Sequence, residues 1–183
     1  MTFAEILQIS TYKKLTKAYM VLLFYCVILF VASTLGYICD KKNGFTNGMI
    51  TILALITGLY ATKVNKIGII GAILALLITD PLCDAYSLYT SQKIIEKKTA
   101  YDIGFKAFLS QFLLQTLFLM IIIYSDTVEK GVYYCYIVGI ILTLLYDKYN
   151  NLLLKESFIN VVSILILVLI TYYINTYVYK YFD

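Results

Sequence analysis

The sequence predicts an all-α protein, a polytopic transmembrane helical bundle with about six spans. Apolar residue types make up 61% of the 183 residues, and charged types make up only 14%. Soluble domains are nearer about half apolar and roughly a quarter charged. Apolar runs, several of them close to the roughly 20 residues that cross a bilayer as a helix, alternate with short charged segments. One water-soluble core cannot hide this apolar surplus, so lipid must cover part of it.

The N-terminal residues 1–17 carry Lys13, Lys14 and Lys17 and are expected to form an interfacial segment. The uncharged run 18–38 predicts the first span. A cleaved signal peptide is the alternative interpretation, but the run is longer than the apolar region of such peptides. Residues 18–183 form one transmembrane domain, in which further spans are predicted near residues 45–62, 67–91, 103–125, 131–146 and 158–179. The fifth apolar run, 131–146, is short for a full crossing.

The charged and sulfur-containing residues exclude several classes of function. All 15 basic residues are Lys, and nearly all of these lie outside the predicted spans, so no basic face or guanidinium fork is available for nucleic acid. The chain has no His, the commonest zinc ligand and neutral-pH proton carrier. No two of its four cysteines are spaced as a CxxC site, and we interpret them as small buried thiols. Lysines divide seven to eight between the two sides of the predicted bundle, which leaves its orientation open.

Two carboxylates inside the third apolar run are the most informative residues. A charged Asp at a helix centre costs about 2.5–3.5 kcal/mol on insertion scales. The Ile and Leu residues of this run return roughly 0.3–0.6 kcal/mol each, so the span is marginal if lipid surrounds it. Asp80 and Asp84 are one turn apart and therefore share a helix face. We expect this face to point at protein, water or an ion.

The chemistry of this pair favours a cation. Pro81 cannot donate to the carbonyl of Leu77, which leaves a third oxygen near the two carboxylates. Hard oxygen ligands suit a divalent cation. Two neighbouring carboxylates in a low dielectric also resist double ionisation and can share a proton. The alternative interpretation is that the span is short and Asp80 and Asp84 lie at its polar end, near water.

Other polar residues in the apolar runs admit two interpretations. They form hydrogen bonds between helices, or they line a pore. The candidates for the pore lining are Thr51 in the second run, Ser87 and Ser91 in the third, and Gln111 and Gln115 in the fourth.

Two segments of the chain resemble the vacuolar iron transporter family. Phe45-Thr46-Asn47-Gly48-Met49-Ile50-Thr51 resembles the Asp-Gly-x-x-Thr opening of that family's first helix. The stretch from Asp80 to Lys93, with Asp80-Pro81-Leu82-Cys83-Asp84 followed by Tyr89-Thr90-Ser91-Gln92-Lys93, resembles its second-helix signature. The resemblance covers about residues 45–125. It implies a proton-coupled carrier of divalent iron or manganese that works as a homodimer with its pore at the subunit interface.

The resemblance also assigns roles to individual residues. Asn47 stands where the family has a pore aspartate, and Asp84 stands where many members have a pore methionine. Asp84 also matches a Ser-Asp variant of the signature, with Asp80 one turn before it. The chain departs from the family in four ways: Asn47 replaces a carboxylate, Leu88 replaces a frequent Glu, only residues 92–102 replace the long cytoplasmic metal-binding helices, and an extra span precedes the family-like helices.

Together these features predict a membrane transporter of divalent metal cations, Fe²⁺ or Mn²⁺, with Asp80, Asp84 and Asn47 as metal-binding residues. The metal is the transported substrate, and no permanently bound cofactor, nucleic-acid partner or enzymatic activity is expected. The lipid bilayer and a second copy of the chain are the expected partners. One alternative is a membrane or assembly protein without transport. Another is a membrane enzyme that binds magnesium-diphosphate, since Asp80-x-x-x-Asp84 resembles the acidic motif of intramembrane prenyltransferases, although the second acidic motif of those enzymes is missing.

Overall fold

The computed structural model describes residues 45–182, which fold into helices joined by short connections. No strand occurs within this range. The predicted interfacial segment 1–17 and first span 18–38 lie outside the described residues. The helices are α2 (Phe45–Ala61), α3 (Lys66–Ile95), α4 (Lys97–Tyr124), α5 (Val128–Tyr149) and α6 (Leu154–Phe182).

Four of these helices, α3 to α6, are long and apolar enough to cross a membrane, and α2 is a shorter apolar helix of 17 residues. The predicted class, a helical membrane bundle, is confirmed at this level. The number of six spans stays a prediction.

Helices α3, α5 and α6 extend beyond the predicted spans at both ends, and α4 begins before its predicted span. The fifth run, predicted at 131–146, lies within α5, which begins at Val128 and ends at Tyr149. The charged stretch 92–102 is almost wholly helical, and Glu96 alone separates α3 from α4. Hydropathy detects only the apolar part of a helix, whereas caps set its ends. Thr127, for example, caps α5 by accepting from the backbone N–H of Lys130 at 3.3 Å.

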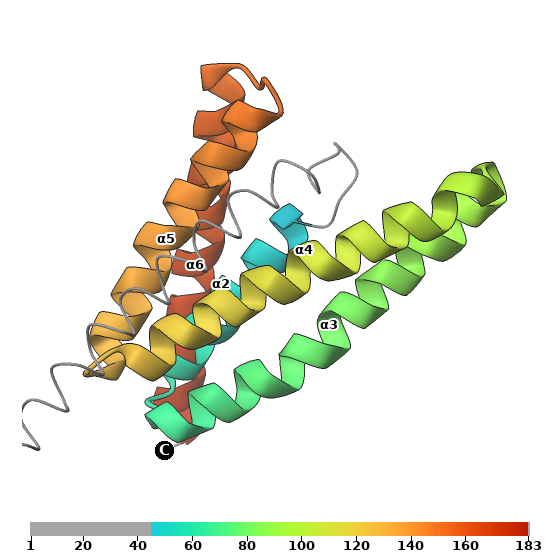
Figure 1. Cartoon of the computed structure of the whole chain (residues 1–183). Coiled ribbons are helices and arrows are strands. Elements are labelled where there is room, and N and C mark those ends of the chain that lie inside the picture. Colours follow the sequence, from blue (N-terminus) through green and yellow to red (C-terminus); the bar gives the residue numbers. More distant parts are fainter. Residues whose placement is uncertain (1–44, 183) are drawn as a thin grey trace, which may run out of the picture.

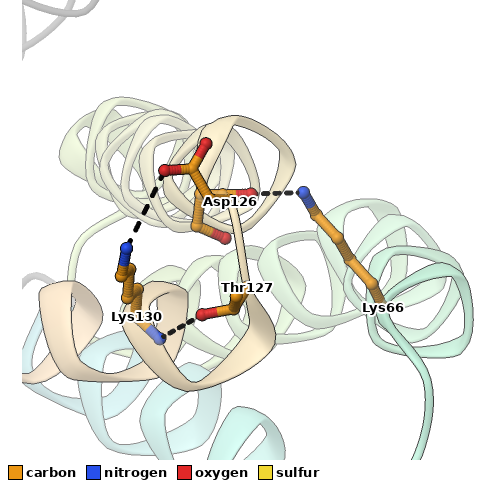
Figure 2. A network of polar contacts seen from close by, with 5 residues as sticks. Lys66, Asp126, Thr127 and Lys130 are labelled. Carbon is orange, nitrogen blue, oxygen red and sulfur yellow. Dashed lines mark hydrogen bonds and ion pairs between the residues drawn. The ribbon is translucent and has the colours of Figure 1, made fainter.

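Helices α3 and α4 form a long antiparallel hairpin whose connection projects beyond the other helices (Figure 1). The two backbones approach closely at Gly104, where a Cβ atom would lie 3.0 Å from the carbonyl oxygen of Ala85. At the other end of the hairpin, Lys66 Nζ donates to the carbonyl oxygens of Ile123 at 2.8 Å and Ser125 at 2.6 Å. Figure 2 shows Lys66 reaching across to this α4–α5 connection. A lysine there also meets the negative end of the α4 dipole.

Helix α2 packs against α4, α5 and α6 and supplies much of the core. Its Met49, Ile52 and Ile56 are fully buried. The Phe45 ring stacks on Tyr146 of α5 with centroids 4.6 Å apart, which fixes the start of α2 beside the end of α5. The short, buried α2 is therefore the element around which the longer helices assemble.

The outer faces of the long helices are apolar. On α3, the large side chains Leu74, Ile78, Leu82 and Tyr86 recur every fourth residue and are all exposed within the described part of the chain. Helix α6 exposes a similar set, which includes Ile159, Ile166, Leu169, Ile170, Tyr173 and Tyr177. Continuous apolar faces of this size are typical of surfaces that lipid or another subunit covers.

The Lys66 bonds yield a first prediction. Replacing Lys66 with Met removes both charge-assisted hydrogen bonds and should lower the free energy of unfolding by about 1–2 kcal/mol. The matched control is Lys130→Met in the same network (Figure 2), because Lys130 Nζ lies 4.0 Å from Asp126 Oδ2 in an exposed pair that should contribute about 0.5 kcal/mol or less. Unfolding of the purified variants in detergent micelles measures the difference. Equal losses for both variants would contradict the role given to Lys66.

Candidate functional site

The two aspartates of α3 face two glutamines of α4. Gln111 Nε2 donates to Asp84 Oδ2 at 2.7 Å, and Gln115 Nε2 donates to Asp80 Oδ2 at 2.7 Å. Both pairs are spaced i, i+4 on their own helices. Because α3 and α4 run antiparallel, this equal spacing produces two successive rungs between them.

Helix α2 adds a third donor to this site. Asn47 Nδ2 donates to Asp84 Oδ2 at 2.6 Å, so one carboxylate oxygen accepts from amides on two different helices. The approach of α2 depends on Gly48, where an added Cβ would lie only 2.9 Å from Gln111 Cγ. We define the carboxylate–amide cluster as Asn47, Asp80, Asp84, Gln111 and Gln115.

The cluster lies between the core and the surface of the described residues. Gln111 and Gln115 are completely buried, Asp80 and Asp84 are half-buried, and Asn47 is exposed. Helix α3 continues past both aspartates to Ile95. The aspartates therefore lie within α3 and share one face. The alternative, in which they lie near water at the polar end of a short membrane span, stays open because a helix can continue past the end of a span.

The electrostatic environment of the cluster is unusual because, within residues 45–182, every donor to its carboxylates is a neutral amide. The ion pairs found among residues 45–182, Lys106–Asp102 and Lys130–Asp126, do not involve Asp80 or Asp84. Amides orient a carboxylate and satisfy part of its hydrogen-bonding capacity, but they leave its charge uncompensated. Two such charges in an apolar bundle are costly unless a cation or proton offsets them.

The oxygen atoms at the site are few. Within residues 45–182, no group of three or more His, Cys, Asp or Glu side chains is close enough to hold a metal ion. Besides the two carboxylates, the site offers the amide oxygen of Gln115, which is buried and has no hydrogen-bond partner among the described residues. Since a divalent cation of this kind takes about six ligands, water or a second copy of the chain would have to supply the rest.

The hydroxyls predicted to line a pore do not join the cluster. Thr51 Oγ1 donates to the carbonyl of Asn47 at 3.0 Å, within α2. Ser91 Oγ donates to the carbonyl of Leu88 at 3.0 Å, within α3, and Ser87 is exposed. Of the predicted site residues, the structure therefore brings together the metal-ligand candidates and the two glutamines, and it leaves Thr51, Ser87 and Ser91 apart from them.

A fully buried carboxylate outside the cluster was not predicted. Asp147 was expected in a loop after the fifth span, but it lies in α5 and is only 1% exposed. Asn160 Nδ2 of α6 donates to its Oδ1 at 3.1 Å. Its Oδ2 has no hydrogen-bond partner among the described residues. The sequence did contain a signal for this contact: Asn160 is a polar residue inside the sixth apolar run, and it needs a hydrogen-bond partner within the bundle.

Comparisons with known proteins bear on the resemblance to vacuolar iron transporters. No known family model, curated protein or solved structure matches this chain. The resemblance stays a prediction from the sequence, and the case for a functional site depends on the geometry of the carboxylate–amide cluster.

The rungs of the cluster yield a prediction about helix pairing. Gln115→Leu leaves Asp80 without its amide donor and should lower the free energy of unfolding by about 1–3 kcal/mol. In the double variant Gln115→Leu/Asp80→Leu no carboxylate is stranded, so the loss should fall short of the summed single losses by about 0.5–2 kcal/mol. Reversible unfolding in mixed micelles measures this coupling. A cycle that pairs Asp80→Leu with Thr116→Val, whose hydroxyl bonds within α4, is the control and should be additive.

A separate prediction concerns the approach of α2 to α4. Gly48→Ala forces the Gln111 side chain away and should lower stability by about 1–3 kcal/mol. Gly71→Ala on α3 is the matched control, because an added Cβ there meets nothing within 4 Å. The control should raise helix stability by about 0.5–1 kcal/mol. Thermal unfolding compares the two, and a neutral Gly48→Ala would show that α2 does not approach α4 at this residue.

Proposed function

We propose that the protein transports divalent metal cations, Fe²⁺ or Mn²⁺, across a membrane, and that the carboxylate–amide cluster binds the cation during transport. The observation that carries this proposal is that, among the residues that the structure describes, Asp80 and Asp84 pair with neutral amides only. A cation that reaches the cluster offsets charge that the described residues leave uncompensated.

The cluster keeps room for a ligand on its oxygen atoms. An ionised carboxylate has about four lone-pair sites. The amides take two of them on Asp84 and one on Asp80. Carboxylate and amide oxygens are the ligand types that suit Mn²⁺ and similar hard cations. Because only part of the coordination shell is protein, binding should be reversible enough for release, as transport requires.

Proton coupling and a homodimer extend the proposal. Two carboxylates one turn apart favour a state that holds a single proton when no metal is present, and arrival of a dication would displace that proton. A second copy of the chain would add another pair of carboxylates to an incomplete coordination shell. Asn47 lies on the exposed side of the cluster, where such a copy has access.

A membrane or assembly protein without transport is the second candidate. Carboxylate–amide bonds also join membrane helices for structural reasons. The small number of acidic, His and Cys side chains near the cluster within residues 45–182 favours this alternative.

Metal uptake into proteoliposomes tests the proposal. Asp84→Asn keeps an oxygen that accepts from Asn47 and Gln111 but removes the charge, so the initial rate of Mn²⁺ or Fe²⁺ uptake should fall about tenfold or more, equivalent to about 1.4 kcal/mol or more. Asp80→Asn should act in the same direction. Asp126→Asn is the control, because this exposed carboxylate lies in the α4–α5 connection. A metal-sensitive dye trapped in the vesicles reports the rate.

The results separate the two candidates. Equal uptake by the wild type and Asp84→Asn would rule out this cluster as the transport site. Uptake by the wild type no faster than by empty vesicles, in protein shown to be folded by thermal unfolding, would favour the assembly role.

A further inference from the structure

A cavity of about 880 Å³ lies away from the carboxylate–amide cluster, among the end of α2, the start of α5 and the end of α6. In Figure 1 the C-terminal end of α6 lies at the same end of the molecule as the α2–α3 connection. Its lining combines tyrosines, two lysines and one carboxylate: Tyr60, Lys63, Glu129, Tyr172, Thr176 and Lys180 are among the residues that form it.

The walls of the cavity have the composition expected where helices emerge from a membrane. Tyrosines concentrate where the hydrocarbon of a bilayer meets the headgroups. The rings of Tyr60 and Tyr172 lie 6.5 Å apart and form part of the wall. Lys63 Nζ lies 5.3 Å from the centroid of the Tyr179 ring, a cation–π contact that holds this ammonium group at the cavity. The cavity therefore has an aromatic wall and a positive charge at the level where helices end.

The cavity also holds a polar group without a partner. Thr176 Oγ1 is buried and makes no hydrogen bond to the described residues. Leaving a buried hydroxyl unpaired is unfavourable, so a ligand that accepts a hydrogen bond would be stabilised there. Glu129 is the one carboxylate among the described lining residues, and the Tyr60 hydroxyl donates to it at 3.5 Å. Two ammonium groups against one carboxylate, together with the positive end of α5, favour an anion.

We propose that this cavity binds an anionic phosphate group, the chemistry that the headgroup of an acidic phospholipid shares with free phosphate. Lys63 and Lys180 supply the charge and Thr176 the neutral donor. The cavity is larger than a phosphate ion, and its tyrosine walls suit the glycerol region of a lipid. Basic pockets between transmembrane helices bind acidic lipids in this way. This site is independent of metal transport, since none of its residues belongs to the carboxylate–amide cluster.

Thermal unfolding of the full-length protein in nanodiscs tests the proposal. One arm uses phosphatidylcholine alone, a second adds phosphatidylglycerol, and a third adds inorganic phosphate to phosphatidylcholine at matched ionic strength. Phosphatidylglycerol should raise the unfolding midpoint by about 2–4 °C. The variant Lys63→Gln/Lys180→Gln should lose this rise, and Thr176→Val should reduce it without a change in charge. The control, Lys148→Gln/Lys155→Gln, removes the same charge from exposed lysines near the α5–α6 connection and should keep the rise.

The arms distinguish the sources of the phosphate. A rise with phosphatidylglycerol that depends on Lys63 and Lys180 identifies a lipid headgroup site. A rise with inorganic phosphate that has the same dependence supports a site for free phosphate. The proposal is overturned if neither addition stabilises the wild type, or if the control loses the rise as fully as Lys63→Gln/Lys180→Gln. Should that double variant fail to fold, an unchanged rise in Thr176→Val would overturn it.

Discussion

The arrangement of three helices depends on the need to satisfy two carboxylates inside an apolar bundle. Asp84 accepts from amides on α2 and α4, and Asp80 accepts from a second amide on α4. A slip of α3 along α4 by one residue would break both rungs at once and leave half-buried carboxylates unpaired, which is costly in a low dielectric. Apolar packing alone discriminates weakly between such registers in lipid, because lipid tails are as apolar as the helix faces. The polar cluster therefore specifies the register.

Neutral donors and charged donors would have different consequences at this position. A lysine opposite each aspartate would give a permanently compensated pair with little affinity for a further cation. Amides hold the carboxylates in place and leave their charge available. Because amides leave the charge of the buried carboxylates uncompensated, the bundle is less stable than an apolar one of similar shape. A bound cation would compensate this charge and stabilise the bundle. The uncompensated charge therefore links the fold to the proposed transport.

The sequence was sufficient for the class of fold. It also nominated every member of the cluster, but together with three hydroxyl residues that do not belong to it, and it was insufficient for the pairing. Apolar runs located the helices because lipid exposure demands them, and i, i+4 spacing put Asp80 beside Asp84. Which glutamine meets which aspartate depends on helix register, which no local pattern encodes. Asp147 was misplaced because a helix continues beyond its apolar run wherever packing and caps support it. Lys63 and Thr176 both line the cavity although they are far apart in the chain, so only the tertiary structure reveals the cavity.

The geometry of Asp84 also connects occupancy of the proposed cation site to helix position. Asn47 and Gln111 donate to the same oxygen of Asp84, and α2 approaches α4 through Gly48 at this depth. A cation that coordinated this shared oxygen, instead of the free lone pairs of the other one, would displace the amides, and binding there would weaken the contacts that hold α2 against α3 and α4. By thermodynamic linkage, any arrangement of α2 that weakens those amide bonds must then bind the cation more tightly. Alternating access, which the proposed transport requires, needs two arrangements of the same helices with different cation affinity, and the cluster would supply the interaction that distinguishes them.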